Sequence, residues 1–272
     1  MTQQNETNGL VASLRAYLEE LQATGVDGLP FAEAVPPAAT GPTAKADSQQ
    51  AVSGESAAAM TESSAGSSPA SVGSRGETLE EVRLELGECC RCTLGKTRTS
   101  LVFGVGNPRA RIVFVGEAPG RDEDLQGEPF VGEAGQLLTR IITRMGLTRD
   151  DVYICNVLKC RPPGNRNPEP AEIEQCGPFM LRQVKAIAPE VVVALGTFAA
   201  QTLLGTKSPI SKLRGHFHDY HGIPLMPTFH PSFLLHNKND KEKFWEVWDD
   251  MVQVMGKLNM TVPDVKRKNE KD

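Results

Sequence analysis

The pattern of apolar and polar positions changes near residue 79, after which short apolar runs alternate with longer amphipathic stretches. Four runs have the length and composition of strands, and the third is nearly all β-branched, as in a sheet covered on both faces. The predicted strands are Ile112–Val115, Val152–Val157, Val191–Leu195 and Pro224–Thr228. The predicted helices are Ala134–Met145, Pro170–Ile187, Thr197–Leu204 and Asp240–Leu258.

Strands that alternate with helices of this length predict an α/β fold. We expect a three-layer α/β/α sandwich around a central, mainly parallel four-stranded sheet. Ligands of such sheets bind beyond the carboxyl ends of the strands. Candidate chemistry is therefore sought in the segments that follow each strand.

The first 78 residues differ in composition from the rest of the chain. Within residues 1–30, four leucines spaced three or four apart predict a short amphipathic helix, either a docking element for a protein partner or a marginal helix without one. Residues 31–78 are rich in Ala, Ser, Gly and Pro and are predicted to be a disordered linker. The predicted folded domain is 79–260, and 261–272 is expected to be a charged flexible tail.

Charge divides along the same boundary. The chain has a net charge of −5, but residues 1–78 carry −6, residues 79–260 are neutral and the tail carries +1. An acidic total argues against a nucleic-acid partner, for which basic clustering is expected. That objection weakens once only the predicted folded part is counted.

No apolar run is long enough to span a bilayer, and the first residues lack the basic-then-apolar order of a secretory signal. We therefore expect a cytoplasmic protein with no membrane partner. In that compartment cysteines serve more often as thiols or metal ligands than as disulfides.

Four of the six cysteines have the spacing of a metal site. Cys89 and Cys92 form a C-x-x-C pair, and Cys160 and Cys176 follow at longer range. Four thiolates suit a structural zinc or a [4Fe–4S] cluster equally well. Of the other two, Cys155 falls in a predicted strand and is expected in the core, while Cys90 could replace a neighbouring ligand.

Two glycine-rich loops follow the first predicted strand. In the first, Gly116 to Gly120, a proline between glycines makes a tight turn that exposes main-chain N–H groups and aims Glu117 into the expected crevice. In the second, Phe130 lies between turn glycines. Its ring is either ordinary core or a surface for stacking on a planar base.

Two of the other three predicted strands lead into polar side chains. Asn156 can offer both an acceptor and donors to the edge of a pyrimidine. It precedes a basic loop whose Lys159, Arg161 and Arg166 either contact phosphates or form a solvated charged surface. His230 follows the last predicted strand. It can donate to an oxygen on which charge develops, or it can be a structural histidine.

Together these segments resemble the family 4, iron–sulfur uracil-DNA glycosylases of the uracil-DNA glycosylase superfamily. The resemblance covers residues 79–260 and none of residues 1–78. It rests on the C-x-x-C at 89–92, GEAPGRDED at 116–124, GEPFVGEAGQLL at 127–138, NVLKCRPPGNRNP at 156–168, Cys176, and HPSFLL at 230–235.

The resemblance implies roles for single residues. Cys89, Cys92, Cys160 and Cys176 would bind a structural [4Fe–4S] cluster. Phe130 would stack on a flipped uracil, Asn156 would bind its polar edge and His230 would lie near its O2 atom. Further residues expected to line the substrate site are Gly116, Glu117, Ala118, Gly120, Glu123 and Asn165.

The implied activity is excision of uracil from single- or double-stranded DNA by a monomeric enzyme, leaving an abasic site for base excision repair. Ala118 stands where the best-known branch of the superfamily has a water-activating aspartate. Hydrolysis would then rest on stabilising the leaving uracil, with Glu117 or Glu123 orienting the water.

Two other functions compete with this one. A uracil-DNA-binding protein with little turnover is disfavoured because RPPGNRNP lacks the histidine found in a related branch that forms a covalent adduct. A zinc-stabilised nucleotide-binding module lacks a P-loop or GxGxxG pattern.

Overall fold

The computed structural model describes residues 76–237 and 240–264. The predicted helix within residues 1–30, nearly all of the predicted linker 31–78 and most of the tail 261–272 lie outside the described residues. Among the described residues, the structure contains no helix that is both long and apolar enough to cross a bilayer.

A six-stranded sheet forms the centre of the described part of the chain. Its order is β1-β3-β2-β4-β6-β5, in which the four inner strands are parallel and the two edge strands are antiparallel. The strands are β1 (Val105–Gly106), β2 (Ile112–Gly116), β3 (Tyr153–Asn156), β4 (Val191–Leu195), β5 (His218–Tyr220) and β6 (Ile223–Thr228).

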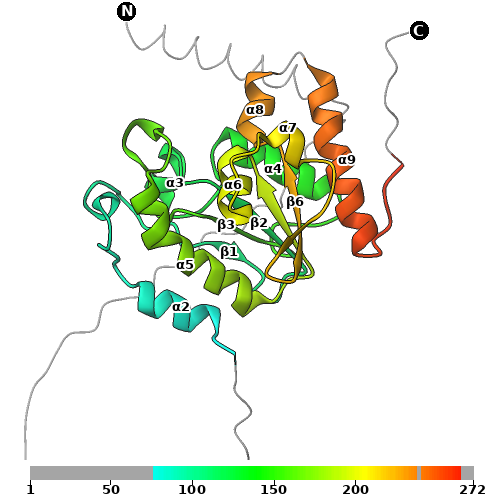
Figure 1. Ribbon diagram of the computed structural model, residues 1–272. Helices are drawn as coiled ribbons and strands as arrows, with labels where there is room; N and C mark the ends of the chain where they lie inside the picture. The colour runs from blue at the N-terminus through cyan, green and yellow to red at the C-terminus, as the bar shows by residue number, and fades with distance from the viewer. Residues whose placement is uncertain (1–75, 238–239, 265–272) are drawn as a thin grey trace, which may run out of the picture. The chain divides into compact units, whose positions relative to one another are not determined.

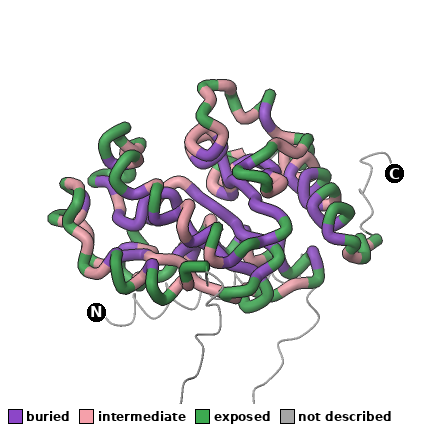
Figure 2. The backbone as a smooth tube through the Cα atoms, turned by 60° about the horizontal axis from the view of Figure 1, so that its bottom comes forward, coloured by how far each residue is buried: buried purple, intermediate pink, exposed green. Residues whose placement is uncertain are grey.

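Helices cover both faces of the sheet because alternate residues of each inner strand point to opposite sides. Ile112 and Phe114 of β2 pack with α4, α8 and α9, whereas Val113 and Val115 pack with α5, α6 and α7. Figure 1 shows these helices on either side of the sheet, and Figure 2 shows that buried residues follow the strands through the middle. The predicted three-layer α/β/α sandwich is confirmed.

The helices agree with the predicted ones where the amphipathic pattern is long. The α-helices are α2 (Leu79–Leu86), α3 (Arg121–Gln126), α4 (Glu133–Arg144), α5 (Pro170–Ile187), α6 (Thr197–Leu204), α7 (Ile210–Leu213), α8 (Pro231–His236) and α9 (Lys241–Lys257). Two 3-10 helices, η1 (Thr93–Lys96) and η2 (Pro163–Asn165), lie in the loops.

Helix α2 is attached to the outside of α5. Val82 and Leu86 of α2 pack against Phe179 of α5 in a separate apolar cluster. Arg182 of α5 also pairs with Glu77 and Glu85. This contact matters for the cysteines, because the C-x-x-C pair begins only three residues after α2 ends.

Candidate functional site

A cavity of about 470 Å³ lies at the carboxyl ends of the parallel strands. Every residue expected to line the substrate site reaches it except Gly116, which lies directly behind Asn156 and Phe130. The residues that line the cavity are Glu117, Ala118, Pro119, Gly120, Glu123, Phe130, Ala134, Asn156, Pro162, Asn165, Arg166, Gly196, Thr197, Phe198, His230 and Ser232.

Asn156, the last residue of β3, provides an open polar group at the cavity wall. The residue is only 2% exposed, and its Oδ1 has no hydrogen-bond partner in the structure. A buried acceptor left unpaired costs about 1–3 kcal/mol, so this atom is poised for a ligand that donates. Gly116 makes room for it, since a Cβ there would lie 2.3 Å from Oδ1 and 2.6 Å from the Phe130 ring.

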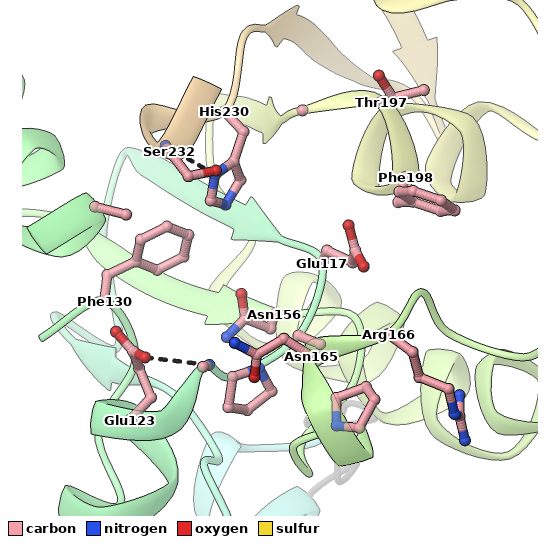
Figure 3. Close-up of a pocket in the computed structure, with 16 residues that line it drawn as sticks. Glu117, Glu123, Phe130, Asn156, Asn165, Arg166, Thr197, Phe198, His230 and Ser232 are labelled. Atoms are coloured by element: carbon pink, nitrogen blue, oxygen red, sulfur yellow. Dashed lines mark hydrogen bonds between the residues drawn. The ribbon is translucent and has the colours of Figure 1, made fainter. Parts of the chain in front are cut away.

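Phe130 is held in an unusual backbone conformation. Its φ of 55° lies in the left-handed region, which is costly for an aromatic residue. Arg149 stabilises this turn by donating from Nη1 to the Phe130 oxygen (3.1 Å) and from Nη2 to the Pro129 oxygen (2.8 Å). The Phe130 ring lies 5.6 Å from the His230 ring between centroids, so both face the same opening (Figure 3).

Glu123 joins the two glycine-rich loops to each other. Its Oε2 accepts from the Gly120 N–H (3.1 Å), and its Oε1 accepts from the N–H groups of Val131 (2.9 Å) and Gly132 (3.0 Å). The carboxylate therefore sets the spacing between the Glu117 loop and the Phe130 turn. With both oxygens engaged by main-chain donors, it is less free than Glu117 to hold a water.

Glu117 follows β2 and reaches the cavity from the opposite side to Glu123 (Figure 3). Its main-chain oxygen accepts from the Leu158 N–H (3.0 Å), which fixes the loop beside the end of β3. Burial raises the pKa of the Glu117 carboxyl to about 7, because a desolvated carboxylate is disfavoured. The group can thus exchange a proton near neutral pH.

His230 is fixed as a neutral donor. Its Nδ1 accepts from the Ser232 N–H (3.1 Å) and lies 2.7 Å from the Ser232 hydroxyl. Burial of the ring lowers the pKa of His230 to about 4. With Nδ1 accepting, the hydrogen-bond network assigns the single ring proton to Nε2.

The backbone beside His230 is that of Gly196, which directly follows β4. A Cβ on Gly196 would lie 2.8 Å from the His230 Cβ, and its φ of 90° is unfavourable for other residues. Gly196, Thr197, Phe198 and Ser232 were not among the predicted site residues. A glycine directly after a buried strand was the available signal for the first of these.

The loop after β3 differs in part from its predicted role. The prediction that Lys159 contacts phosphates is wrong, because its side chain is fully buried and donates from Nζ to the Asn156 oxygen (2.7 Å). Arg161 Nε donates to Oδ1 of the exposed Asn165 (2.7 Å). Arg166 lines the cavity and forms an ion pair with the buried Glu172.

The four cysteines expected to bind a metal come from three separate segments, after α2, after β3 and within α5. Electrostatic effects connect them, since burial and then the nearby Cys92 and Cys89 raise the pKa of Cys176. Within residues 76–237 and 240–264, however, no three Cys, His, Asp or Glu side chains are grouped closely enough to hold a single metal ion.

N–H groups point at the sulfurs of this set. Arg91 Nη1 donates to Cys89 Sγ (3.3 Å), Arg98 Nη1 to Cys160 Sγ (3.4 Å) and the Lys159 main-chain N–H to Cys176 Sγ (3.2 Å). Of the other two cysteines, Cys155 is fully buried in the core, as predicted, and Cys90 is exposed.

The fold and cavity define a class of α/β protein with a polar, aromatic-walled site at its strand ends, and comparison with known proteins specifies the class. The model of the Uracil DNA glycosylase superfamily matches residues 103–252. The chain therefore belongs to the uracil-DNA glycosylase superfamily and, by the relatives described next, to its type-4 branch.

Three type-4 uracil-DNA glycosylases are similar to this chain. That of Archaeoglobus fulgidus is 44% identical over 196 residues, which cover 69% of this chain and 98% of the relative. That of Thermotoga maritima is 49% identical over 169 residues, covering 61% and 88%. That of Saccharolobus solfataricus is 42% identical over 170 residues, covering 59% and 79%.

Proposed function

We propose that the chain is a DNA repair glycosylase that flips uracil out of DNA and hydrolyses its N-glycosidic bond, releasing uracil and leaving an abasic site. The observation that carries this proposal is the unpartnered, buried Oδ1 of Asn156 beside the Phe130 ring. Uracil offers an N–H donor next to a carbonyl acceptor, which matches the acceptor and donors of one Asn side chain. Its flat ring suits stacking on Phe130.

Bond cleavage places negative charge on the departing uracil and positive charge on the sugar. The neutral His230 can donate a hydrogen bond from Nε2 to uracil O2, where the negative charge develops. The Asn156 amide stabilises the same anion at the opposite edge. One such fixed donor contributes about 3–4 kcal/mol to the transition state.

In this proposal Glu117 orients the water that attacks the sugar. Ala118 provides no carboxylate, and both Glu123 oxygens accept main-chain hydrogen bonds. Glu117 lines the cavity, and burial brings the pKa of its carboxyl to about 7. In its ionised form it can orient a water toward the developing oxocarbenium ion.

The cysteine set fits an iron–sulfur cluster better than a zinc ion. Four cysteine thiolates could also hold a zinc ion, but the resemblance to the iron–sulfur glycosylases favours a cluster. N–H groups directed at three of the sulfurs suit anionic cluster ligands. Cys89, Cys92, Cys160 and Cys176 would hold a [4Fe–4S] cluster that supplies structural support, since glycosidic hydrolysis moves no electrons.

The substrate in this proposal is uracil in single- or double-stranded DNA. Flipping costs a few kcal/mol in a duplex and less in a mismatch or single strand. Uracil opposite guanine or in single strands should therefore be excised faster than uracil opposite adenine. A monomer acting in the cytoplasm is sufficient for this chemistry.

The test uses the full chain and an end-labelled oligonucleotide with one uracil, cleaved by alkali at abasic sites. We expect the wild-type chain to produce the cleaved strand, and Asn156→Ala to lower the single-turnover rate about 100- to 1,000-fold. The purified protein should be brown, with broad visible absorbance in both forms.

Asn107→Ala is the matched control, because this Asn lies beside the opposite, amino end of β3. It should excise uracil at the wild-type rate. A uracil strand that survives the wild-type protein intact would rule out the enzyme, and binding without cleavage would indicate a uracil-DNA-binding protein instead.

A further inference from the structure

Lys159 connects the cysteine set to the residue that faces the ligand cavity. Its main-chain N–H donates to Cys176 Sγ (3.2 Å), while its side-chain Nζ donates to the Asn156 oxygen (2.7 Å). Its own main-chain oxygen accepts from the Val102 N–H (2.8 Å). One buried residue therefore holds the end of β3 from the side opposite the cavity.

Asn156 needs such support because of its place in the chain. It is the last residue of β3, and the N–H groups of the next two residues bond to the main-chain oxygens of Gly116 and Glu117 before the chain reaches Cys160. A side chain at a strand end can shift with its backbone, and a misplacement of about 1 Å at a reacting group can lower a rate about 100-fold. A bond across three residues limits that shift.

The placement of a lysine here has a cost that packing alone does not explain. The whole residue is 0% exposed, although lysine is rarely buried without a paired carboxylate. An apolar residue of similar length would fill the same space without desolvating an amine. The hydrogen bond to Asn156 is what an apolar side chain could not supply.

We propose that Lys159 is a positioning residue for uracil excision, which fixes the Asn156 amide against the base by anchoring the Asn156 main chain to the cysteine-bearing segment. This inference rests on the proposed function. The amine donates in either protonation state, so the anchoring does not depend on its charge.

The decisive experiment is a double-mutant cycle in single-turnover excision. Lys159→Met removes the donor but keeps the volume. We expect it to lower the rate roughly 10- to 100-fold when Asn156 is present. In the Asn156→Ala background, measured over longer incubations, it should change the residual rate by less than about twofold, because its effect passes through the missing amide.

Three further measurements separate positioning from general damage. Lys159→Met should retain the wild-type visible absorbance per chain and bind uracil-free duplex of the same sequence with unchanged affinity. Lys159→Arg, which keeps a donor at the end of a long side chain, should recover part of the rate. Lys185→Met, at an exposed lysine of α5, is the matched control and should behave as the wild type.

Equal slowing by Lys159→Met with and without Asn156 would overturn the inference, as would no slowing at all. If Lys159→Met does not fold, Lys159→Gln, which is too short to reach the carbonyl, replaces it in the same cycle. Failure of both to fold would also overturn it, because the role would then be stability alone. An inactive wild-type chain, in contrast, would rule out the proposed function itself.

Discussion

Glu117 is the site residue whose ionisation should be visible in the rate. Burial raises the pKa of its carboxyl to about 7, so the carboxylate forms only as the pH rises through that value. If the carboxylate orients water, the single-turnover rate should increase from about pH 6 to about pH 8 and then level off. His230, with a pKa of about 4, stays neutral over this interval and adds no second change.

Glu117→Gln provides the comparison for this pH profile. The amide keeps the size of the side chain but does not titrate, so the variant should be slower by about 100-fold and nearly independent of pH. Rates for both proteins are measured with excess enzyme on the same uracil oligonucleotide. A profile with the same slope in the variant would assign the titration to another group.

The positions of candidate residues could be predicted where a strand pattern fixed them. Asn156 lies near the end of a predicted strand, Glu117 and His230 follow predicted strands, and all three line one cavity. The sequence did not reveal that Lys159 is buried, because the residues that cover it come from other segments. Arg149 was also missed, since its acceptors at Pro129 and Phe130 lie about twenty residues earlier and leave no local pattern.

Helix α6 offers a test at the scale of an element, because a glycine with positive φ stands at each end. Gly196 has φ 90° and would place a Cβ 2.8 Å from the His230 Cβ, whereas Gly205 has φ 60° and meets nothing within 4 Å. Alanine at either position should cost about 1–2 kcal/mol in backbone strain. Only Gly196→Ala should also displace His230 and lower the excision rate, by up to about 100-fold.

The two variants therefore form a matched pair. Thermal unfolding should show similar losses of stability, and single-turnover assays below both melting temperatures should separate them. If Gly205→Ala slowed excision as much as Gly196→Ala did, the effect would be one of helix stability, and the proposed contact with His230 would be excluded.

Element prediction succeeded for the longer elements and for α6, but not for α2, which has the same length as α6. The bounds of α5 and α6 agree with the sequence pattern, and all four inner strands were expected. The edge strands β1 and β5 were not, because two or three residues are too few to show a period of two. Helix α3 was also missed. Its six residues, RDEDLQ, are nearly all polar and carry no apolar stripe.

Over the described part of the molecule, the four cysteines belong to segments that are distant in sequence. Cys89 and Cys92 follow α2, Cys160 follows β3, and Cys176 belongs to α5. The packing of α2 on α5 through Val82 and Phe179 brings the first pair toward the last cysteine. Spacing in the sequence indicated a metal site with zinc and iron–sulfur both open, and the resemblance to the iron–sulfur glycosylases favoured the cluster.

If a [4Fe–4S] cluster joins these segments, its loss should affect stability and excision together. Cys176→Ala should remove the visible absorbance and lower the free energy of unfolding by about 3 kcal/mol or more, roughly 10 °C in Tm for a domain of this size. Excision should fall as well, because the Lys159 N–H loses its sulfur acceptor behind Asn156. Iron and sulfide analysis, thermal unfolding and the oligonucleotide assay measure the three effects.

Cys90→Ala is the control within the C-x-x-C segment. This cysteine is exposed, so its removal should leave iron content, Tm and excision unchanged. Loss of iron in Cys90→Ala would mean that Cys90 replaces one of its neighbours as a ligand. Full excision by a colourless, stable Cys176→Ala protein would contradict the structural role, since the end of β3 would then hold Asn156 in place without any cluster behind it.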